Sequence, residues 1–246
     1  MSARRVLPSG RLFCNGINAY AVIYPFTVYG WSEITIAEWI YPYWPKANTL
    51  YSKFSMIGDY WTDYPSTLFT TSNRTDYIYL HVVWTTRKPD GTRGYYYWEV
   101  LGYRNSWVHV VRRFTADREI SFWVNGVKMR SYTVPATEKT ILEWNPDTAT
   151  YPERYRRFVL GMNVLFSEWM KVSYGDFRIY DRGLTDNEIL QLYGGTDIRN
   201  GLRVHLDFSE CEGNIAYDKS GNGNHATLYN TQWIVKKASR VLASAR

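Results

Sequence analysis

Cysteine is scarce in this chain of 246 residues, which contains only Cys14 and Cys211. Two thiols are too few for a disulfide framework or a cysteine-based metal cluster. Glutamine is equally scarce, since only Gln191 and Gln232 occur, and arginine outnumbers lysine by 20 to nine. A low content of glutamine, a heat-labile amide, and an excess of arginine favour a thermophilic source, although 14 asparagines point the other way.

Long apolar runs are also missing from the sequence. No segment reaches the roughly 20 consecutive apolar residues that a membrane-spanning helix needs. The opening residues 1–8 are too short and too charged for a secretory signal peptide. We therefore expect no insertion into a membrane, and no export signal in this stretch.

Catalytic motifs are absent as well. The sequence has no nucleophile elbow, phosphate-binding loop or zinc-ligand spacing. Glycoside hydrolysis needs two carboxyl groups roughly 5–10 Å apart, but Glu33 and Glu38 are five residues apart and would face opposite sides of a strand. Glu210 and Glu212 alternate, yet they fall in a turn-rich segment where such a pair is usually solvated. We therefore expect that the protein is not an enzyme.

Basic residues form only short clusters, at Arg112-Arg113 and among Arg154, Arg156 and Arg157. No nucleic-acid-binding motif accompanies them, so a solvated or salt-bridged surface explains them better than contacts to phosphate. We expect no nucleic acid partner, although the net charge is +6.

Aromatic residues are abundant at 17% of the chain, with 22 tyrosines and 11 tryptophans. This is more than a core needs, so some rings are expected on the surface. Flat rings stack on sugar faces, and tyrosine and tryptophan are also enriched at protein interfaces. The candidates for a glycan platform or a subunit interface are Tyr43, Trp44, Tyr60, Trp61, Asp63 and Tyr64.

The pattern along the chain predicts short strands, because alternating apolar residues are broken by Gly, Pro, Asn and Asp. Asn125-Gly126 predicts a tight hairpin, since both residues tolerate positive φ. Thr185 and Glu188 form a capping box that starts a helix, which Gly194-Gly195 can end. Strands are expected at 19–24, 33–41, 77–84, 95–101, 107–113, 119–124, 127–132, 158–161 and 174–180, and one short helix near 185–193.

Five motifs follow one another at residues 26–42, 105–114, 120–128, 158–163 and 174–193. Together they resemble a laminin-G-like domain of the concanavalin A-like lectin/glucanase superfamily. The resemblance covers roughly residues 11–195. It implies an all-β fold, a two-sheet antiparallel jelly-roll sandwich with one short helix. It also implies that Trp39, Trp107 and Phe122 are core residues.

The segment 201–233 is out of place, because a similar segment opens domains of this type. The two ends of the chain also nearly repeat each other, with six of nine positions identical between 3–11 and 238–246. We therefore predict a single domain over 1–246 that is circularly permuted, in which 200–246 supplies the opening strands in cis. Two alternatives remain: this segment completes a neighbouring subunit, or the chain is a fragment with an exposed apolar edge.

The Gly-rich turn in this segment offers oxygen ligands to a hard cation. Asp218, Asn222 and Asn224 would supply them, and the resemblance implies an acid from the closing strand. By position that acid is Asp176, with Asp207 as a second option. One structural Ca²⁺ is therefore expected, the alternative being an ordinary Asx-rich turn without metal.

If the segment 200–246 is placed before residue 11, as the permutation requires, both cysteines belong to the opening part of the sandwich. Cys14 then lies in the strand that follows the junction, and Cys211 lies just after the expected first strand. A Cys14–Cys211 disulfide is therefore predicted to pin the permuted segment to the body. The alternative is two buried free thiols.

These features favour a non-catalytic, lectin-like β-sandwich that acts as a structural or adhesive surface subunit of a virion or extracellular assembly. The alternative is a carbohydrate-binding module that recognises glycans through Tyr/Trp loops. A glycoside hydrolase comes third, because it rests on superfamily kinship alone. The expected partners are glycans or other copies of the chain, and the expected location is the extracellular surface or a virion.

Overall fold

The computed structural model describes residues 10–43, 52–55, 67–74, 77–101, 105–143, 145, 147, 156–162 and 169–234. Within these residues the chain is built from β-strands, with the helix α2 (Asp186–Tyr193) and the 3-10 turn η1 (Ile141–Glu143) as its helical parts. No helix in this described part is long and apolar enough to cross a bilayer.

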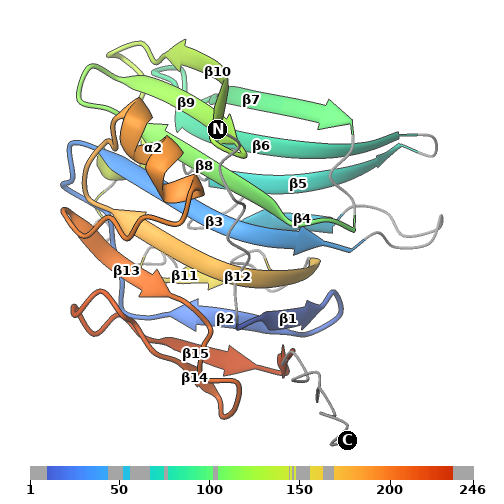
Figure 1. The fold of residues 1–246 in the computed structure, drawn as a ribbon. Coiled ribbons are helices and arrows are strands. Elements are labelled where there is room, and N and C mark those ends of the chain that lie inside the picture. The colour runs from blue at the N-terminus through green and yellow to red at the C-terminus, as the bar shows by residue number, and fades with distance from the viewer. Residues whose placement is uncertain are drawn as a thin grey trace, which may run out of the picture.

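The largest sheet has eight strands and forms one layer (Figure 1). Its order is β10 (Val127–Thr133), β9 (Glu119–Val124), β8 (Val108–Phe114), β3 (Ile34–Pro42), β12 (Lys171–Tyr180), β1 (Leu12–Asn15) and β16 (Gln232–Trp233), and β13 (Leu202–Leu206) also pairs with β12. All of these pairings are antiparallel.

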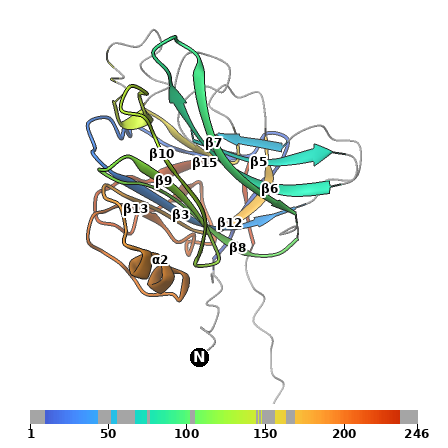
Figure 2. The same ribbon diagram turned by 90° about the horizontal axis from the view of Figure 1, so that it is seen from above.

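Two four-stranded sheets lie on the other side of the core (Figure 2). The β2 sheet has the order β11 (Phe158–Leu160), β2 (Tyr20–Ile23), β15 (Ala226–Tyr229) and β14 (Ile215–Ala216). The β6 sheet has the order β4 (Ser52–Ser55), β5 (Thr67–Arg74), β6 (Tyr77–Arg87) and β7 (Arg93–Leu101). Buried side chains from all three sheets belong to one hydrophobic cluster. The fold is an all-β jelly-roll sandwich, which confirms the predicted fold class.

Alternation along β3 shows how the sequence builds this core. Ile34, Ile36 and Ile40 point between the sheets and are at most 1% exposed. Ala37 and Trp39 point to the opposite, outer face of the large sheet, where they meet α2 and its last residue. The burial of apolar surface, at about 25 cal/mol per Å², holds the layers together.

Helix α2 covers part of the outer face of the large sheet (Figure 1). The predicted capping box is confirmed, because Thr185 Oγ1 accepts from the Glu188 N–H while the Glu188 carboxylate accepts from the Thr185 N–H. Hydrogen bonds from Arg182 lower the pKa of Glu188 to about 2. Gly195, at φ 92°, follows the helix as expected for a left-handed stop.

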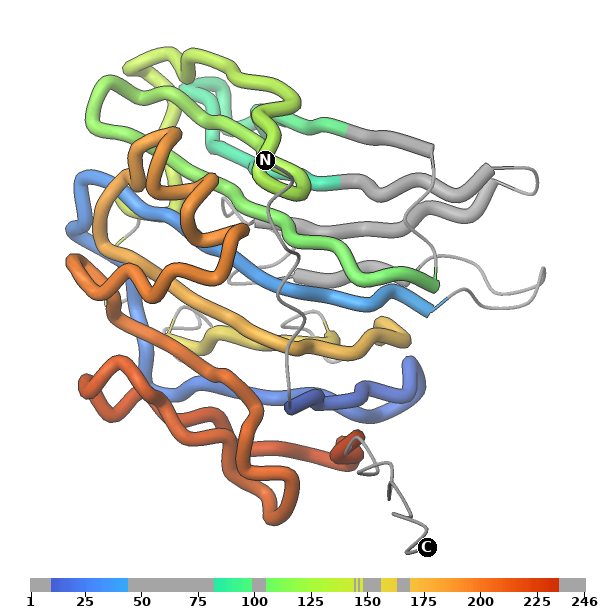
Figure 3. Tube along the Cα trace, viewed as in Figure 1, coloured from blue at the N-terminus to red at the C-terminus, as the bar shows by residue number. Residues whose placement is uncertain are grey.

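The C-terminal segment 201–234 pairs with its own chain (Figure 3). β13 lies along the second half of β12, while β1 lies along the first half of the same strand. β15 pairs with β2, and β16 pairs with β1. The Ile234 N–H donates to the Arg11 carbonyl oxygen at 3.0 Å, so the two ends of the described chain lie side by side.

All nine predicted strands are present, with ends that differ by up to three residues. The implication that Trp39, Trp107 and Phe122 are buried core residues is confirmed. Phe122 belongs to the cluster between the sheets, whereas Trp39 and Trp107 do not. The ring of Trp39 instead stacks on Tyr193 of α2 at 5.7 Å, on the outer face.

Candidate functional site

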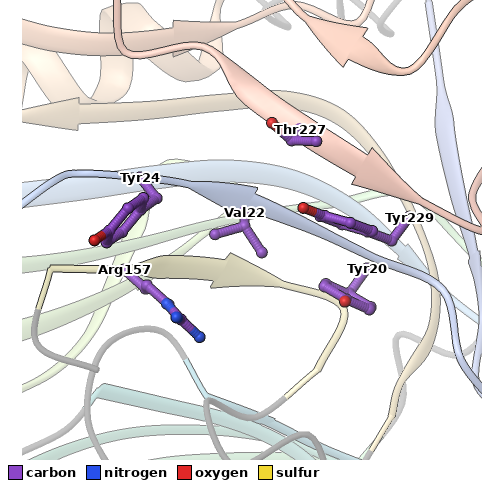
Figure 4. Close-up of a pocket in the computed structure, with 6 residues that line it drawn as sticks. All are labelled: Tyr20, Val22, Tyr24, Arg157, Thr227 and Tyr229. Carbon is purple, nitrogen blue, oxygen red and sulfur yellow. The ribbon is translucent and has the colours of Figure 1, made fainter. Parts of the chain in front are cut away.

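An open pocket of about 230 Å³ lies on the outer face of the β2 sheet. Figure 4 shows Tyr24 on one side of it, Tyr20 and Tyr229 on the other, and Val22 between them. The described residues that line it are Tyr20, Val22, Tyr24, Arg157, Thr227 and Tyr229.

Alternation along β2 explains why the tyrosines line this pocket. Ala21 and Ile23 face the core and are at most 1% exposed. Their neighbours Tyr20, Val22 and Tyr24 therefore point to the opposite face of the sheet. The sequence Y-A-V-I-Y thus places two rings on one surface with an aliphatic residue between them.

The second wall comes from β15, some 200 residues further along the chain. Its antiparallel register with β2 sets Thr227 opposite Val22 and Tyr229 opposite Tyr20. The Tyr20 and Tyr229 rings stack, with centroids 4.6 Å apart and an interplanar angle of 14°. Tyr24 is 52% exposed and Tyr229 is 43% exposed, so ring surface remains accessible to a ligand.

Arg157 supplies the cation of the pocket. It directly precedes β11, whose residue Phe158 lies opposite Ile23, and this register brings Arg157 beside Tyr24. The Arg157 Cζ atom lies 5.5 Å from the centroid of the Tyr24 ring, a cation–π distance. Burial raises the pKa of Tyr20, with a smaller contribution from Tyr229, and Arg157 opposes this rise.

The lining residues determine what the pocket can do. Tyrosine rings offer flat apolar faces, while the phenol and threonine hydroxyls both donate and accept hydrogen bonds. The described lining includes no carboxyl group and no histidine, and so no pair for acid–base hydrolysis of a glycosidic bond. The arrangement is suited to holding a ligand with both an apolar face and hydroxyl groups.

The sequence prediction placed its glycan platform elsewhere. Trp44, Tyr60, Trp61, Asp63 and Tyr64 lie outside the residues that the structure describes, so their role stays a prediction. Tyr43 lies on the outer face of the large sheet. There its ring contacts those of Tyr41 at 4.8 Å and Phe13 at 5.3 Å, and its hydroxyl lies 3.2 Å from Ser173 Oγ.

The residues of the predicted calcium loop are engaged in hydrogen bonds. Asp218 accepts from the backbone N–H groups of His205 at 2.8 Å and Asn224 at 3.0 Å. The side-chain amides of Asn222 and Asn224 donate to the Arg203 carbonyl oxygen at 3.4 and 2.8 Å. These contacts hold the Asx-rich turn together through its own polar groups.

The two other proposed calcium ligands are also paired. Asp176 accepts from Arg178 at 2.9 Å and lies 3.0 Å from His205 Nε2. Burial raises the pKa of Asp176, but these two partners outweigh it and the pKa is lowered. Asp207 accepts from the Ser209 N–H and hydroxyl. The described residues hold no group of three His, Cys, Asp or Glu suited to a metal ion, so Ca²⁺ here stays a prediction.

The predicted disulfide is wrong for this structure, because both cysteines are free thiols. Cys14 is fully buried on β1, and its Sγ faces Gly161, where an added Cβ would lie 2.6 Å away. Burial raises the pKa of the Cys14 thiol to about 12. Cys211 lies instead in the loop after β13 at φ 60° and is half-buried.

The chain is a two-layer antiparallel jelly-roll β-sandwich with an open aromatic pocket on one face. Solved structures share this fold. A candidate carbohydrate-binding protein from Bacteroides ovatus superimposes with a TM-score of 0.61 and 16% identity, over 94% of this chain and 61% of that one. The botulinum neurotoxin serotype D binding domain has a TM-score of 0.50 and 15% identity, over 77% of this chain and 43% of that one.

The heptameric SAP-like pentraxin from Limulus polyphemus matches over 90% of this chain and 94% of its own, with a TM-score of 0.52 and 12% identity. At these identities the likeness shows the fold alone. This chain spans only 61% and 43% of the Bacteroides and botulinum structures. No family model and no curated protein matches the sequence.

Proposed function

We propose that this protein is a lectin-like, non-catalytic domain that binds glycans in the pocket of the β2 sheet. The observation that carries the proposal is the stacked pair Tyr20 and Tyr229, which faces Tyr24 across an open pocket of about 230 Å³. The jelly-roll fold supports it, since one solved structure of this fold is a candidate carbohydrate-binding protein.

The physical basis is the two-sided character of a sugar ring. Its C–H face packs against an aromatic ring, and its hydroxyl groups need hydrogen-bond partners at the edges. Half-exposed Tyr24 and Tyr229 offer the ring faces, and Thr227 offers a hydroxyl between them. A pocket on adjacent strands is also largely pre-formed, which reduces the ordering cost of binding.

Tyr229→Ala is expected to weaken glycan binding at least tenfold, about 1.4 kcal/mol, because it removes an accessible ring and half of the stacked pair. A glycan array identifies the ligand, and isothermal titration calorimetry measures its affinity for each variant. Tyr97→Ala is the matched control, because Tyr97 is a 40% exposed tyrosine on β7, outside the pocket. Binding that survives Tyr229→Ala unchanged, or no binding of any glycan by the unmodified protein, refutes the proposal.

We propose a second role, as a self-associating subunit of an extracellular surface or virion, from the similarity of residues 3–11 to residues 238–246. Six of nine positions are identical between these two segments, and within one chain the Ile234 N–H donates to the Arg11 carbonyl oxygen. In a circularly permuted domain, a direct link would join 234 to 11. In an assembly, the end of one copy would instead meet the start of the next.

Size-exclusion chromatography with light scattering tests this second role. We expect a concentration-dependent rise in mass above the 28.9 kDa of one chain. A variant that ends at residue 237 lacks the second nonamer and is expected to remain monomeric. A strict monomer at high concentration of the full chain counts against the role, as does association that the shortened chain retains.

A further inference from the structure

A second group of aromatic side chains lies on the outer face of the large sheet, away from the pocket. Along β3, Ile40 points between the sheets, so its neighbour Tyr41 points to the outer face. Three further rings share this face, and contacts with centroids 4.8, 5.3 and 5.6 Å apart link the four rings. This outer aromatic cluster consists of Phe13, Tyr41, Tyr43 and Trp107.

Strand register brings these rings together. Ser173 of β12 lies opposite Phe13 of β1 on one side and opposite Tyr41 of β3 on the other. Because serine is small, rings from the two flanking strands can close over it, and Ser173 is 1% exposed. The Tyr43 hydroxyl lies 3.2 Å from Ser173 Oγ, which holds this ring above β12. The positions of the rings are therefore set by three adjacent strands.

Helix α2 covers the other end of the same face (Figure 1). Its last residue, Tyr193, stacks on Trp39, which lies two residues before Tyr41 on β3. Among the helices and strands that the structure describes, α2 is the element that packs on this face. Beyond its end, Phe13, Tyr41 and Tyr43 remain partly exposed, so they are accessible to a partner.

Two cations border the outer aromatic cluster. The Arg11 Cζ atom lies 5.2 Å from the centroid of the Trp107 ring, and Lys171 Nζ lies 5.8 Å from that of Tyr43. Neither cation forms an ion pair with a residue that the structure describes. The Arg11 Nε atom is buried and has no hydrogen-bond partner in this described part. The outward positions 11, 13, 15, 41, 43, 171 and 173 carry no carboxylate, so this surface is positively charged.

The tilt of the rings indicates the kind of partner. The interplanar angles are 51° between Tyr41 and Tyr43, 67° between Tyr41 and Trp107, and 85° between Phe13 and Tyr43. A sugar packs best on an open, flat ring face, whereas rings that meet edge to face leave ridges and hollows that fit side chains. Tyrosine, tryptophan and arginine are also the residues enriched at the centres of protein interfaces.

We infer that the outer aromatic cluster is a docking surface for an acidic polypeptide segment of a partner protein. Arg11 and Lys171 bind aspartate or glutamate side chains of that segment, and its apolar side chains pack between the tilted rings. Charge complementarity supports this partner, because two cations without a neighbouring carboxylate attract an anion and repel a basic surface. The inference is independent of glycan binding, since the pocket lies on the other layer of the sandwich.

Phage display of random peptides gives the first test. The library is first depleted on the double variant Arg11→Gln/Lys171→Gln, so that the remaining peptides need these two cations, and is then selected on the unmodified protein. We expect the enriched peptides to combine Asp or Glu with Phe, Trp or Leu. No enrichment, or enriched peptides without acidic residues, overturns the inference.

Fluorescence polarisation with the best enriched peptide gives the second test. Arg11→Gln/Lys171→Gln is expected to bind it at least tenfold more weakly. The double variant Lys88→Gln/Arg130→Gln is the matched control, because it removes two charges from exposed positions outside the cluster. It is expected to change binding less than twofold. Equal losses in the two double variants overturn the inference.

Circular dichroism and thermal unfolding verify that each variant is folded. Lys171→Gln alone changes one exposed side chain and provides the test if the double variant unfolds. It is expected to weaken peptide binding at least threefold, and unchanged binding contradicts the proposed contact.

A labelled heparin oligosaccharide and a labelled single-stranded oligonucleotide separate a polypeptide from other anionic partners. Both are expected to bind more weakly than the peptide at ~150 mM salt, where contacts that depend on charge alone are screened. Tighter binding of either one, lost in Arg11→Gln/Lys171→Gln, overturns the polypeptide as the partner.

Discussion

Replacing Arg112 by methionine is expected to lower the free energy of unfolding by about 3–5 kcal/mol, because it leaves a buried carboxylate without its cation. Arg112 Nη2 donates to Glu38 Oε1 at 2.7 Å, and both side chains are 0% exposed. The other carboxylate oxygen of Glu38 is buried and has no hydrogen-bond partner among the described residues. Arg112 is thus the cation that makes this carboxylate tolerable inside the core.

The double variant Glu38→Leu/Arg112→Met is the matched control. It fills the same space with apolar groups, and such replacements of buried ion pairs are often neutral or stabilising. We therefore expect it to recover most of the stability that Arg112→Met loses. Urea denaturation measures all three proteins. A double variant as unstable as the single one would show that Arg112 acts through packing and not through the Glu38 charge.

The pH dependence of Arg112→Met provides an independent check. Burial raises the pKa of Glu38, and Arg112 opposes that rise. Without Arg112 the folded-state pKa moves further above the unfolded value of about 4.3. The folded state then binds the proton more tightly, so this variant gains stability as the pH falls toward that value. If the free energy of unfolding of Arg112→Met changed with pH in the same way as that of the double variant, the electrostatic explanation would be contradicted.

His109 is expected to make the protein sensitive to mild acid. It is 2% exposed and its ring lies beside those of Trp39 at 5.1 Å and Tyr193 at 5.8 Å. Its Nδ1 atom is buried without a partner among the described residues. Burial lowers the pKa of His109 from 6.5 to about 4. Two smaller effects oppose each other, since Asp176 raises this pKa and Arg178 lowers it.

The direction in which stability changes with pH follows from the lowered pKa of His109. Above pH 6.5 the histidine is neutral in both states, and its full contribution to stability is present. As the pH falls from 6.5 to 4, the unfolded chain takes up the proton first. The free energy of unfolding should then decrease by about 3 kcal/mol over this window, on the order of 1.4 kcal/mol per pH unit of pKa difference.

His109→Phe tests this expectation, since phenylalanine packs with the same rings and does not titrate. Denaturation at pH 7.5 and pH 4.5 gives the loss of stability for each protein. The loss should be smaller in His109→Phe. The difference between the two losses gives the contribution of His109, because the other titrating groups are common to both proteins. Equal losses in both proteins would show that the acid sensitivity arises at other groups.

Elements encoded by neighbouring residues could be predicted from the sequence. The hairpin at Asn125-Gly126 and the capping box at Thr185 depend on residues within a few positions of each other, and both are present. In each case local chemistry or the local alternation was sufficient.

The pocket depends on strand pairing that no local signal reveals. The alternation in Tyr20–Tyr24 indicates two rings on one face, but not which strand lies beside them. Tyr229 and Arg157 become neighbours of these rings only through the registers of β15 and β11 with β2. The predicted disulfide is wrong for a related reason, since a shared region of the fold does not bring Cys14 and Cys211 into contact.

The adjacent ends of the described chain also have a mechanical consequence. Arg11 enters β1 at the same end at which β16 leaves through Ile234, and the two strands run antiparallel. Tension applied through both ends would therefore peel β16 from β1 one hydrogen bond at a time, and would not shear all of the bonds together. The link between these strands is a weak point under load, although the same residues lie beside a tightly packed core.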